Sequence, residues 1–144
     1  MAEATRTITA PTPTPETGPF WEAAAKGKLL VKTCTTCERP HHYPRPICPL
    51  CGSDRTEWKE SSGRGAIYSY SVMRRASPPY VIAYVTLEEG VSMMTNLVDC
   101  DFDALRIGQP VRVVWTPSDG GPPVPMFTPA DSSSPRRGEG RVRG

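Results

Sequence analysis

The sequence contains no apolar run long enough to span a membrane, and residues 1–17 hold no apolar stretch of the kind that forms a signal peptide. It has five cysteines, of which four fall in metal-binding spacing, so a secreted disulfide framework would leave an odd thiol. A reducing compartment fits this cysteine usage better. We therefore expect a soluble cytoplasmic protein that has no membrane segment.

The sequence also has a small net charge and few histidines. The formal net charge is +2 and there are two histidines. A nucleic-acid-binding domain usually shows a basic stripe, so this balance argues against a polyanion partner. No serine, histidine and acid stand in a recognisable catalytic motif, and the sequence predicts no catalytic residues. A length of 144 residues allows one ordinary domain, or a small metal module joined to one small barrel.

Both ends of the chain lack the composition of a folded core. Residues 1–18 consist mainly of Thr, Pro and Ala, and residues 130–144 are rich in Ser, Pro, Gly and Arg. Such segments bury too little apolar surface to offset the entropy of ordering. We predict a disordered arm over residues 1–18 and a disordered basic tail over residues 130–144.

Two Cys-x-x-Cys pairs, separated by ten residues, are the strongest motif in the chain; the cysteines are Cys34, Cys37, Cys48 and Cys51. Such a spacing can bring four thiolates to one point, and Zn²⁺ takes four sulfurs tetrahedrally at about 2.3 Å. Gly52 directly after the second pair tolerates the positive φ that a tight metal-binding knuckle requires. The motif predicts one structural zinc per chain.

The same stretch offers two alternatives, histidine ligands and iron. His41 and His42 lie between the pairs, but four cysteines already fill a tetrahedral site, so we expect both to be loop residues. Iron is an alternative because the second pair looks like a rubredoxin knuckle. The first pair has Glu38 where such a knuckle has glycine, and the loop between the pairs is short, which favours zinc.

Short elements flank the cysteines. Residues 19–27 predict a helix with Pro19 in its first turn, Gly27 past its end, and Phe20 and Trp21 as its large apolar side chains. These rings either pack onto the body of the protein or face a partner. Residues 28–33 and 55–59 predict strands that lead into and out of the metal site. Together, residues 19–60 predict a helix plus zinc ribbon.

The pattern changes to alternating strands after a glycine-containing joint at residues 61–65, where we place a domain boundary. Strands are predicted at residues 66–73, 80–87, 91–98 and 111–116, with a fifth around residues 125–127. The first should place Tyr68, Tyr70 and Val72 on one face. The fold class is therefore mainly β, with a short N-terminal helix, a zinc ribbon, and a five-stranded OB-fold barrel over residues 61–129.

With these parts in place, the chain resembles small proteins that pair a rubredoxin-like zinc ribbon with an acyl-CoA-associated OB-fold. The resemblance runs from residue 19 to about residue 129. It rests on Phe20-Trp21, residues 27–29, the four cysteines, and residues 63–69, 79–83, 87–90 and 105–111.

The resemblance implies a noncatalytic subunit. Members of this family partner thiolase-superfamily enzymes, including thiolases, lipid-transfer-protein-like aldolases and acyltransferases, and help organise a shared acyl-CoA site. A heterotetramer of two plus two chains is expected by analogy with dimeric thiolases. Cys100 is not expected to be a nucleophile, because the adjacent Asp99 and Asp101 disfavour its thiolate.

Candidate contacts to acyl-CoA or to the partner come from the loop after the first barrel strand and from the N-terminal helix. Arginine pairs bidentately with phosphate, so the loop arginines suit coenzyme A, although a solvated basic turn explains them equally well. The candidates are Arg74, Arg75, Pro79, Tyr80, Phe20 and Trp21.

Two other functions use the same features. Single-stranded nucleic acid could stack on Tyr68 and Tyr70 of an OB-fold, with the arginine tail contacting phosphates. Rubredoxin-like electron transfer would require iron and a coloured protein.

Overall fold

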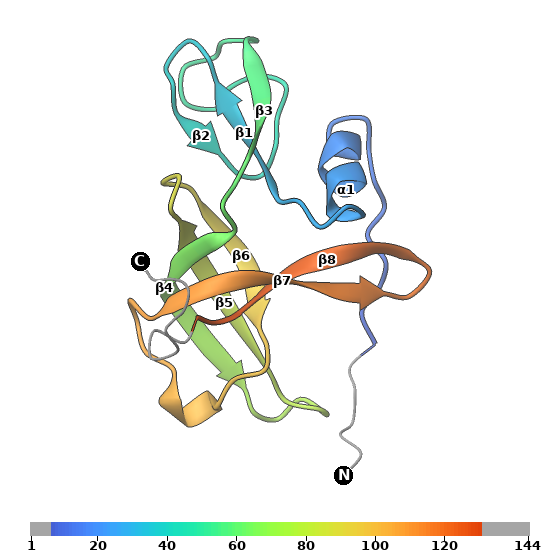
Figure 1. Cartoon of the computed structure of the whole chain (residues 1–144), viewed down its shortest axis with the longest axis vertical. Helices are drawn as coiled ribbons and strands as arrows, with labels where there is room; N and C mark the ends of the chain where they lie inside the picture. The colour runs from blue at the N-terminus through green and yellow to red at the C-terminus, as the bar shows by residue number, and fades with distance from the viewer. Residues whose placement is uncertain (1–6, 131–144) are drawn as a thin grey trace.

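The computed structural model describes residues 7–130. A small three-stranded sheet stands against one end of a closed five-stranded barrel, and a short helix lies beside both (Figure 1). Apart from Ala130, the predicted basic tail lies outside the described residues, as do residues 1–6. Among the described residues no helix has the length and apolarity needed to cross a membrane.

The helix α1 spans Gly18–Ala24, so it is shorter than the predicted residues 19–27. Phe20 and Ala24 are its buried residues. The chain leaves the helix at Gly27, where φ is +76° and the backbone N–H donates to the Ala24 carbonyl at 2.9 Å. Glycine adopts this left-handed conformation without the steric cost of a Cβ atom. The turn sends the chain directly into the ribbon.

The ribbon consists of β1 (Leu30–Cys34), β2 (Pro40–His41) and β3 (Thr56–Glu60), in the antiparallel order β2-β1-β3. The predicted strands on both sides of the cysteines are thus confirmed, and β2 is an addition. Lys32 of β1 places its Nζ 4.4 Å from the centre of the Trp58 ring on β3, a cation–π contact across the sheet.

The barrel confirms the predicted OB-type fold. Its strands are β4 (Arg64–Met73), β5 (Tyr80–Leu87), β6 (Ser92–Leu97), β7 (Pro110–Ser118) and β8 (Gly121–Pro129), closed in the order β4-β5-β6-β8-β7. Alternation on β5 buries Val81, Ala83, Val85 and Leu87, a choice of face that the sequence pattern left open because both sides of this strand are apolar. A 3₁₀ turn, η1 (Phe102–Ala104), links β6 to β7.

The predicted face of β4 is wrong at one residue. The pairing register between β4 and β5 shifts between Ile67 and Ser69, so Tyr68 is the extra residue of a β-bulge. Tyr68 is therefore 66% exposed, while Tyr70 turns inward and its hydroxyl donates to the Leu105 carbonyl at 2.9 Å. A one-residue shift reverses which side of a strand faces the core. Tyr68 and Tyr70 cannot form one stacking platform.

One hydrophobic core connects the ribbon side to the barrel. It contains Phe20, Leu29 and Val31 together with barrel residues such as Val85 and Phe127. The joint at residues 61–65 is also hydrogen-bonded, because Ser61 Oγ donates to Glu89 Oε1 at 2.7 Å and Val113 N donates to the Gly63 carbonyl at 2.7 Å. We propose that residues 19–60 and residues 61–129 fold as two units, and that these units pack together through the shared core.

The expected disordered arm needs correction for residues 7–17. The Asp119 N–H donates to the Ile8 carbonyl at 2.8 Å, and Thr9 forms an isolated parallel bridge with Asp119 in the β7–β8 turn. Thr17 is buried just before α1, and its hydroxyl caps the Thr14 N–H at 2.9 Å. Composition alone missed these contacts because they are made by the backbone.

Candidate metal centre and adjoining groove

Two hydrogen-bonded knuckles carry the four cysteines. Cys34 ends β1, and its N–H donates to the Arg39 carbonyl at 3.0 Å, which closes the first knuckle. In the second, Cys48 N donates to the Ser53 carbonyl at 2.8 Å. The knuckles are joined by Thr36 Oγ1 and Ser53 Oγ, which lie 2.8 Å apart. This frame holds both pairs of sulfurs on the same side.

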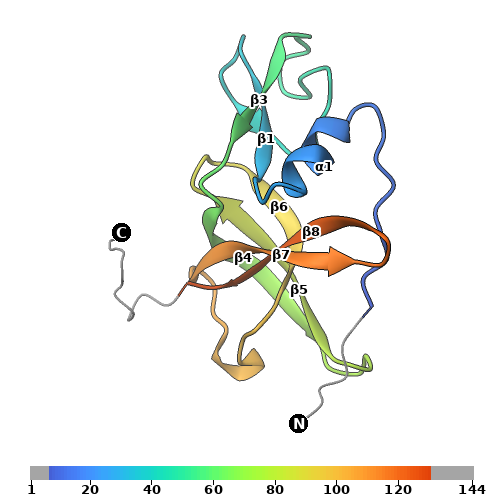
Figure 2. The same cartoon turned by 45° about the vertical axis from the view of Figure 1, so that its right-hand side comes forward.

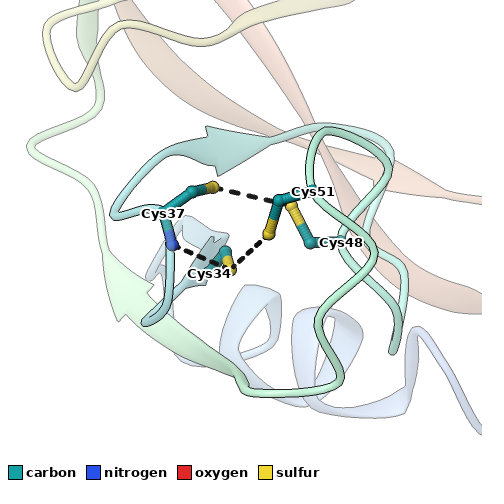
Figure 3. A group of neighbouring side chains, drawn as sticks. All are labelled: Cys34, Cys37, Cys48 and Cys51. Atoms are coloured by element: carbon teal, nitrogen blue, oxygen red, sulfur yellow. Dashed lines mark hydrogen bonds between the residues drawn. The ribbon is translucent and has the colours of Figure 1, made fainter.

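The sulfur positions fit a tetrahedral metal. All four Sγ atoms lie within 4.8 Å of one another, and Figure 3 shows them converging on one point. The Cys34–Cys51 sulfur distance is 3.6 Å and the Cys37–Cys48 distance is 3.8 Å. A tetrahedron with Zn–S bonds of about 2.3 Å has edges of roughly 3.8 Å. The four cysteines therefore form a site for one structural zinc.

The surroundings stabilise thiolate in the first knuckle, whereas the pKa of Cys51 in the second is raised to about 11 by burial and by the neighbouring cysteines. The N–H groups of Cys37 and Thr36 point at Cys34 Sγ at 3.4 and 3.3 Å, and these bonds lower the pKa of Cys34 to about 6. The Arg39 side chain hydrogen-bonds to Cys37, which raises the pKa of Arg39. Four thiolates around Zn²⁺ carry a net charge of about −2. The Arg39 cation therefore offsets part of this charge.

The first knuckle has a strained residue that the second lacks. Glu38 has φ +62°, whereas Gly52 occupies the corresponding place at φ +81°. A side chain in the left-handed region costs about 1–2 kcal/mol, partly offset by the entropy that glycine loses on folding. Glu38→Gly should stabilise the zinc-loaded protein by about 0.5–1 kcal/mol in urea unfolding, and Gly52→Ala should destabilise it by about 1 kcal/mol. A loss of stability in Glu38→Gly would contradict this account.

The prediction that His41 and His42 are loop residues is wrong for His41. His41 ends β2, is buried, and its Nε2 accepts the Arg45 N–H at 3.3 Å. Its Nδ1 is buried and has no hydrogen-bond partner among the described residues. Neither imidazole joins the four sulfurs in the metal-type cluster found in the described part of the chain.

A groove of about 470 Å³ lies next to the metal centre, between α1, the ribbon and the barrel wall. Its lining is mostly aromatic or apolar and comprises Phe20, Trp21, His42, Tyr43, Tyr80, Ile82, Met93, Met94, Thr95, Asn96, Val124, Pro125 and Met126. The aromatic wall is continuous, since the Phe20 ring centre lies 4.8 Å from that of Trp21 and 6.2 Å from that of His42. An elongated apolar group fits such a lining.

The structure brings together half of the predicted contact residues. Phe20, Trp21 and Tyr80 line the groove, although they are far apart in sequence. Arg74 lies outside it, and its Nη2 donates to Asp103 Oδ1 at 2.9 Å.

Two further candidates also lie outside the groove. Arg75 and Pro79 are exposed and absent from the lining. Sequence reasoning missed the groove residues His42 and Met94, because no pattern within one segment indicates a wall built from several elements.

His42 gives the groove a pH dependence. Burial, aided by the nearby His41, lowers the pKa of His42 to about 4 from an ordinary value of 6.5. On acidification the imidazole of His42 is therefore protonated near pH 6.5 in the unfolded chain, but only near pH 4 in the folded chain. The free energy of unfolding therefore keeps its full value above pH 6.5. It decreases by up to about 3 kcal/mol as the pH falls toward 4.

His42→Phe should remove this loss. We expect the unfolding free energy of the natural chain to fall more steeply between pH 7 and 4.5 than that of the variant, with zinc in excess. Acid release of zinc affects both proteins alike, so the difference between their curves isolates His42. Parallel curves would show that His42 does not titrate with folding.

Family models match both halves of the chain. The model described as the ChsH2 rubredoxin-like zinc ribbon domain matches residues 21–57, and the ChsH2 C-terminal OB-fold domain matches residues 58–116. The two matches meet within β3, the last strand of the ribbon. The chain belongs to the ChsH2 family.

Named relatives of this ChsH2-type chain include both scaffold proteins and subunits of enzymes. A DUF35 domain-containing scaffold protein of Methanothermobacter thermautotrophicus is 38% identical, over 60% of this chain and 71% of its own length. A probable enoyl-CoA hydratase alpha subunit of Thermomonospora curvata is 39% identical over 77% of this chain. The chain spans only 37% of the length of that subunit.

A solved structure agrees in fold and in sequence. The chain superposes on one from a structure named "Ltp2-ChsH2(DUF35) aldolase" with a TM-score of 0.73 and 35% identity. The match covers 83% of this chain and 98% of that chain. Ribbon and barrel thus occur together in a ChsH2 chain of nearly the same extent, as the sequence resemblance implied.

Proposed function

We propose that this chain is a noncatalytic subunit that complexes with a thiolase-type enzyme and helps form or shield its acyl-CoA site. The observation that carries the proposal is the likeness to the chain of an Ltp2-ChsH2(DUF35) aldolase over 98% of that chain. Relatives named as scaffold proteins support an accessory role. We keep the two-plus-two assembly as part of the proposal, by analogy with dimeric thiolases.

The chemistry of the described residues supports a noncatalytic role. Four cysteines belong to the metal site, which leaves Cys100 as the remaining thiol. Burial, Asp99 and Asp101 raise the pKa of Cys100, so its thiolate is disfavoured. The bond-making residues should therefore belong to the partner enzyme.

The groove is the best place on this chain for part of an acyl-CoA. Its aromatic walls suit the slender, largely apolar arm or acyl group of such a thioester. Arg75 and Pro79 lie in the loop between β4 and β5 that leads into Tyr80, and there they would contact the charged end of the ligand. Arg74 can do so only by giving up Asp103, an exposed ion pair of small energy.

Trp21→Ala tests the groove. The complex of this chain with its enzyme should bind a short acyl-CoA roughly 30-fold more weakly by calorimetry when Trp21 is truncated, because a buried indole typically contributes about 2 kcal/mol or more. Trp58→Ala is the matched control, since Trp58 also packs partly buried against the core but lies outside the groove. Equal affinity of Trp21→Ala and the natural chain would remove the groove from the acyl-CoA site.

The nucleic-acid alternative gains no specific support. Tyr70 is turned inward and hydrogen-bonded to the Leu105 carbonyl, so the stacking platform proposed for it with Tyr68 does not exist. Electron transfer would be tested by metal analysis: a colourless protein with about one zinc per chain rules it out.

A further inference from the structure

One wall of the barrel contains no charged residue. Asp, Glu, Lys and Arg are absent from residues 66–73 of β4, from all of β5 and from all of β6. Charged residues make up 22% of the whole chain, so these strands depart strongly from its average. The neighbouring β3 carries Glu57, Lys59 and Glu60 in five residues. The charges are thus placed on other surfaces.

Large side chains form a row across this wall. Tyr84 of β5 lies directly opposite Met94 of β6, and the β-bulge places Tyr68 of β4 beside the pair of Ser69 and Tyr84. Tyr68, Tyr84 and Met94 are 66%, 43% and 58% exposed. The three strands are consecutive in the barrel wall in Figure 2. The row therefore presents two phenol rings and a thioether to solvent.

The row is continuous with the groove. Met94 belongs to both, and the groove residues Ile82 and Tyr80 follow Tyr84 on the same outer side of β5. Tyr43 of the ribbon also lines the groove and is 49% exposed, but the Arg45 guanidinium lies 5.9 Å from its ring centre, so Tyr43 is not counted with the row. We call Tyr68, Tyr84, Met94 and Ile82 the uncharged face.

We propose that the uncharged face is the surface on which the thiolase-type enzyme docks, an inference that rests on the proposed function. Loss of charge with enrichment of Tyr and Met marks the buried centre of a protein interface. A nucleic acid needs cations against its phosphates, and these strands offer none. Docking here would place the open groove at the boundary between the two subunits, where a shared acyl-CoA site must lie.

Charge insertion tests the uncharged face against a matched site. The probe is a purified thiolase-type enzyme of the Ltp2 aldolase type, and its affinity for the full chain is measured by interferometry at two salt concentrations. Tyr68→Lys, Tyr84→Lys and Met94→Lys should each weaken binding by roughly 30-fold or more. The control is Ile107→Lys, because Ile107 is also 66% exposed but lies in the loop before β7. It should bind as the natural chain does.

The outcomes separate this inference from the proposed function. A natural chain that fails to bind the enzyme overturns both. Binding that is unchanged in Tyr84→Lys and Met94→Lys overturns the docking face alone, provided that zinc content and melting temperature match the natural chain. Self-association that Tyr84→Lys abolishes, without loss of enzyme binding, would assign the face to a second copy of this chain and so overturn the inference.

Discussion

Removal of zinc should unfold the ribbon while the barrel strands remain paired. Between α1 and the joint, the ribbon contributes the buried Leu29 and Val31 and the partly buried Trp58 to the core, so its apolar burial is too small to hold three short strands. Binding of a structural Zn²⁺ by a small module supplies roughly 10–16 kcal/mol, and that energy becomes folding energy. Hydrogen exchange after treatment with a strong chelator should show lost protection in β1 and β3 and retained protection in β5.

The double variant Cys34→Ser, Cys51→Ser should behave in the same way without a chelator. Metal analysis should give about one zinc in the natural chain and little in the variant. Cys100→Ser is the control, because Cys100 lies outside the sulfur cluster, and it should retain both zinc and ribbon protection. A double variant with intact protection in β1 would show that zinc does not hold the ribbon.

Truncation of Phe127 to Ala should destabilise the barrel by about 4 kcal/mol, a typical cost of a buried Phe→Ala change. Phe127 is fully buried in the core and lies where the barrel closes, opposite Leu97 of β6 and Val113 of β7. Its carbonyl also accepts the Val98 N–H at 2.8 Å. Urea unfolding followed by far-ultraviolet dichroism measures the loss.

Phe102→Ala is the comparison for this cavity. Phe102 packs against the same core from η1 but is only partly buried, so we expect a smaller loss of about 1–2 kcal/mol. Equal losses in Phe102→Ala and Phe127→Ala would contradict the view that Phe127 closes the barrel.

The metal site and the order of strands were predictable because their signals are local. Ligands that share one knuckle must be close in sequence, so the spacing of Cys34 and Cys37 identifies them as a ligand pair. Alternation likewise identifies β5 as a strand. In the structure its residues Val81 and Val85 face the core and Tyr84 faces solvent. Such patterns require no knowledge of the neighbouring strands.

Other features depend on contacts between distant segments. The bulge at Tyr68 reflects how β4 pairs with β5, and the groove joins Trp21, His42 and Met94 from three different parts of the fold. The placement of residues 7–17 along the barrel depends on the hydrogen bond that the Asp119 N–H donates to the Ile8 carbonyl. None of these has a sequence pattern of its own.

The central claim is that this chain works as an accessory subunit. The most direct measurement co-expresses it with a thiolase-type enzyme of the Ltp2 aldolase type, then determines the mass of the purified assembly and its turnover of acyl-CoA. We predict a stable complex of two plus two chains, active only when both are present, while the chain alone is inactive. A chain that elutes alone, beside an enzyme that is equally active without it, would contradict the account.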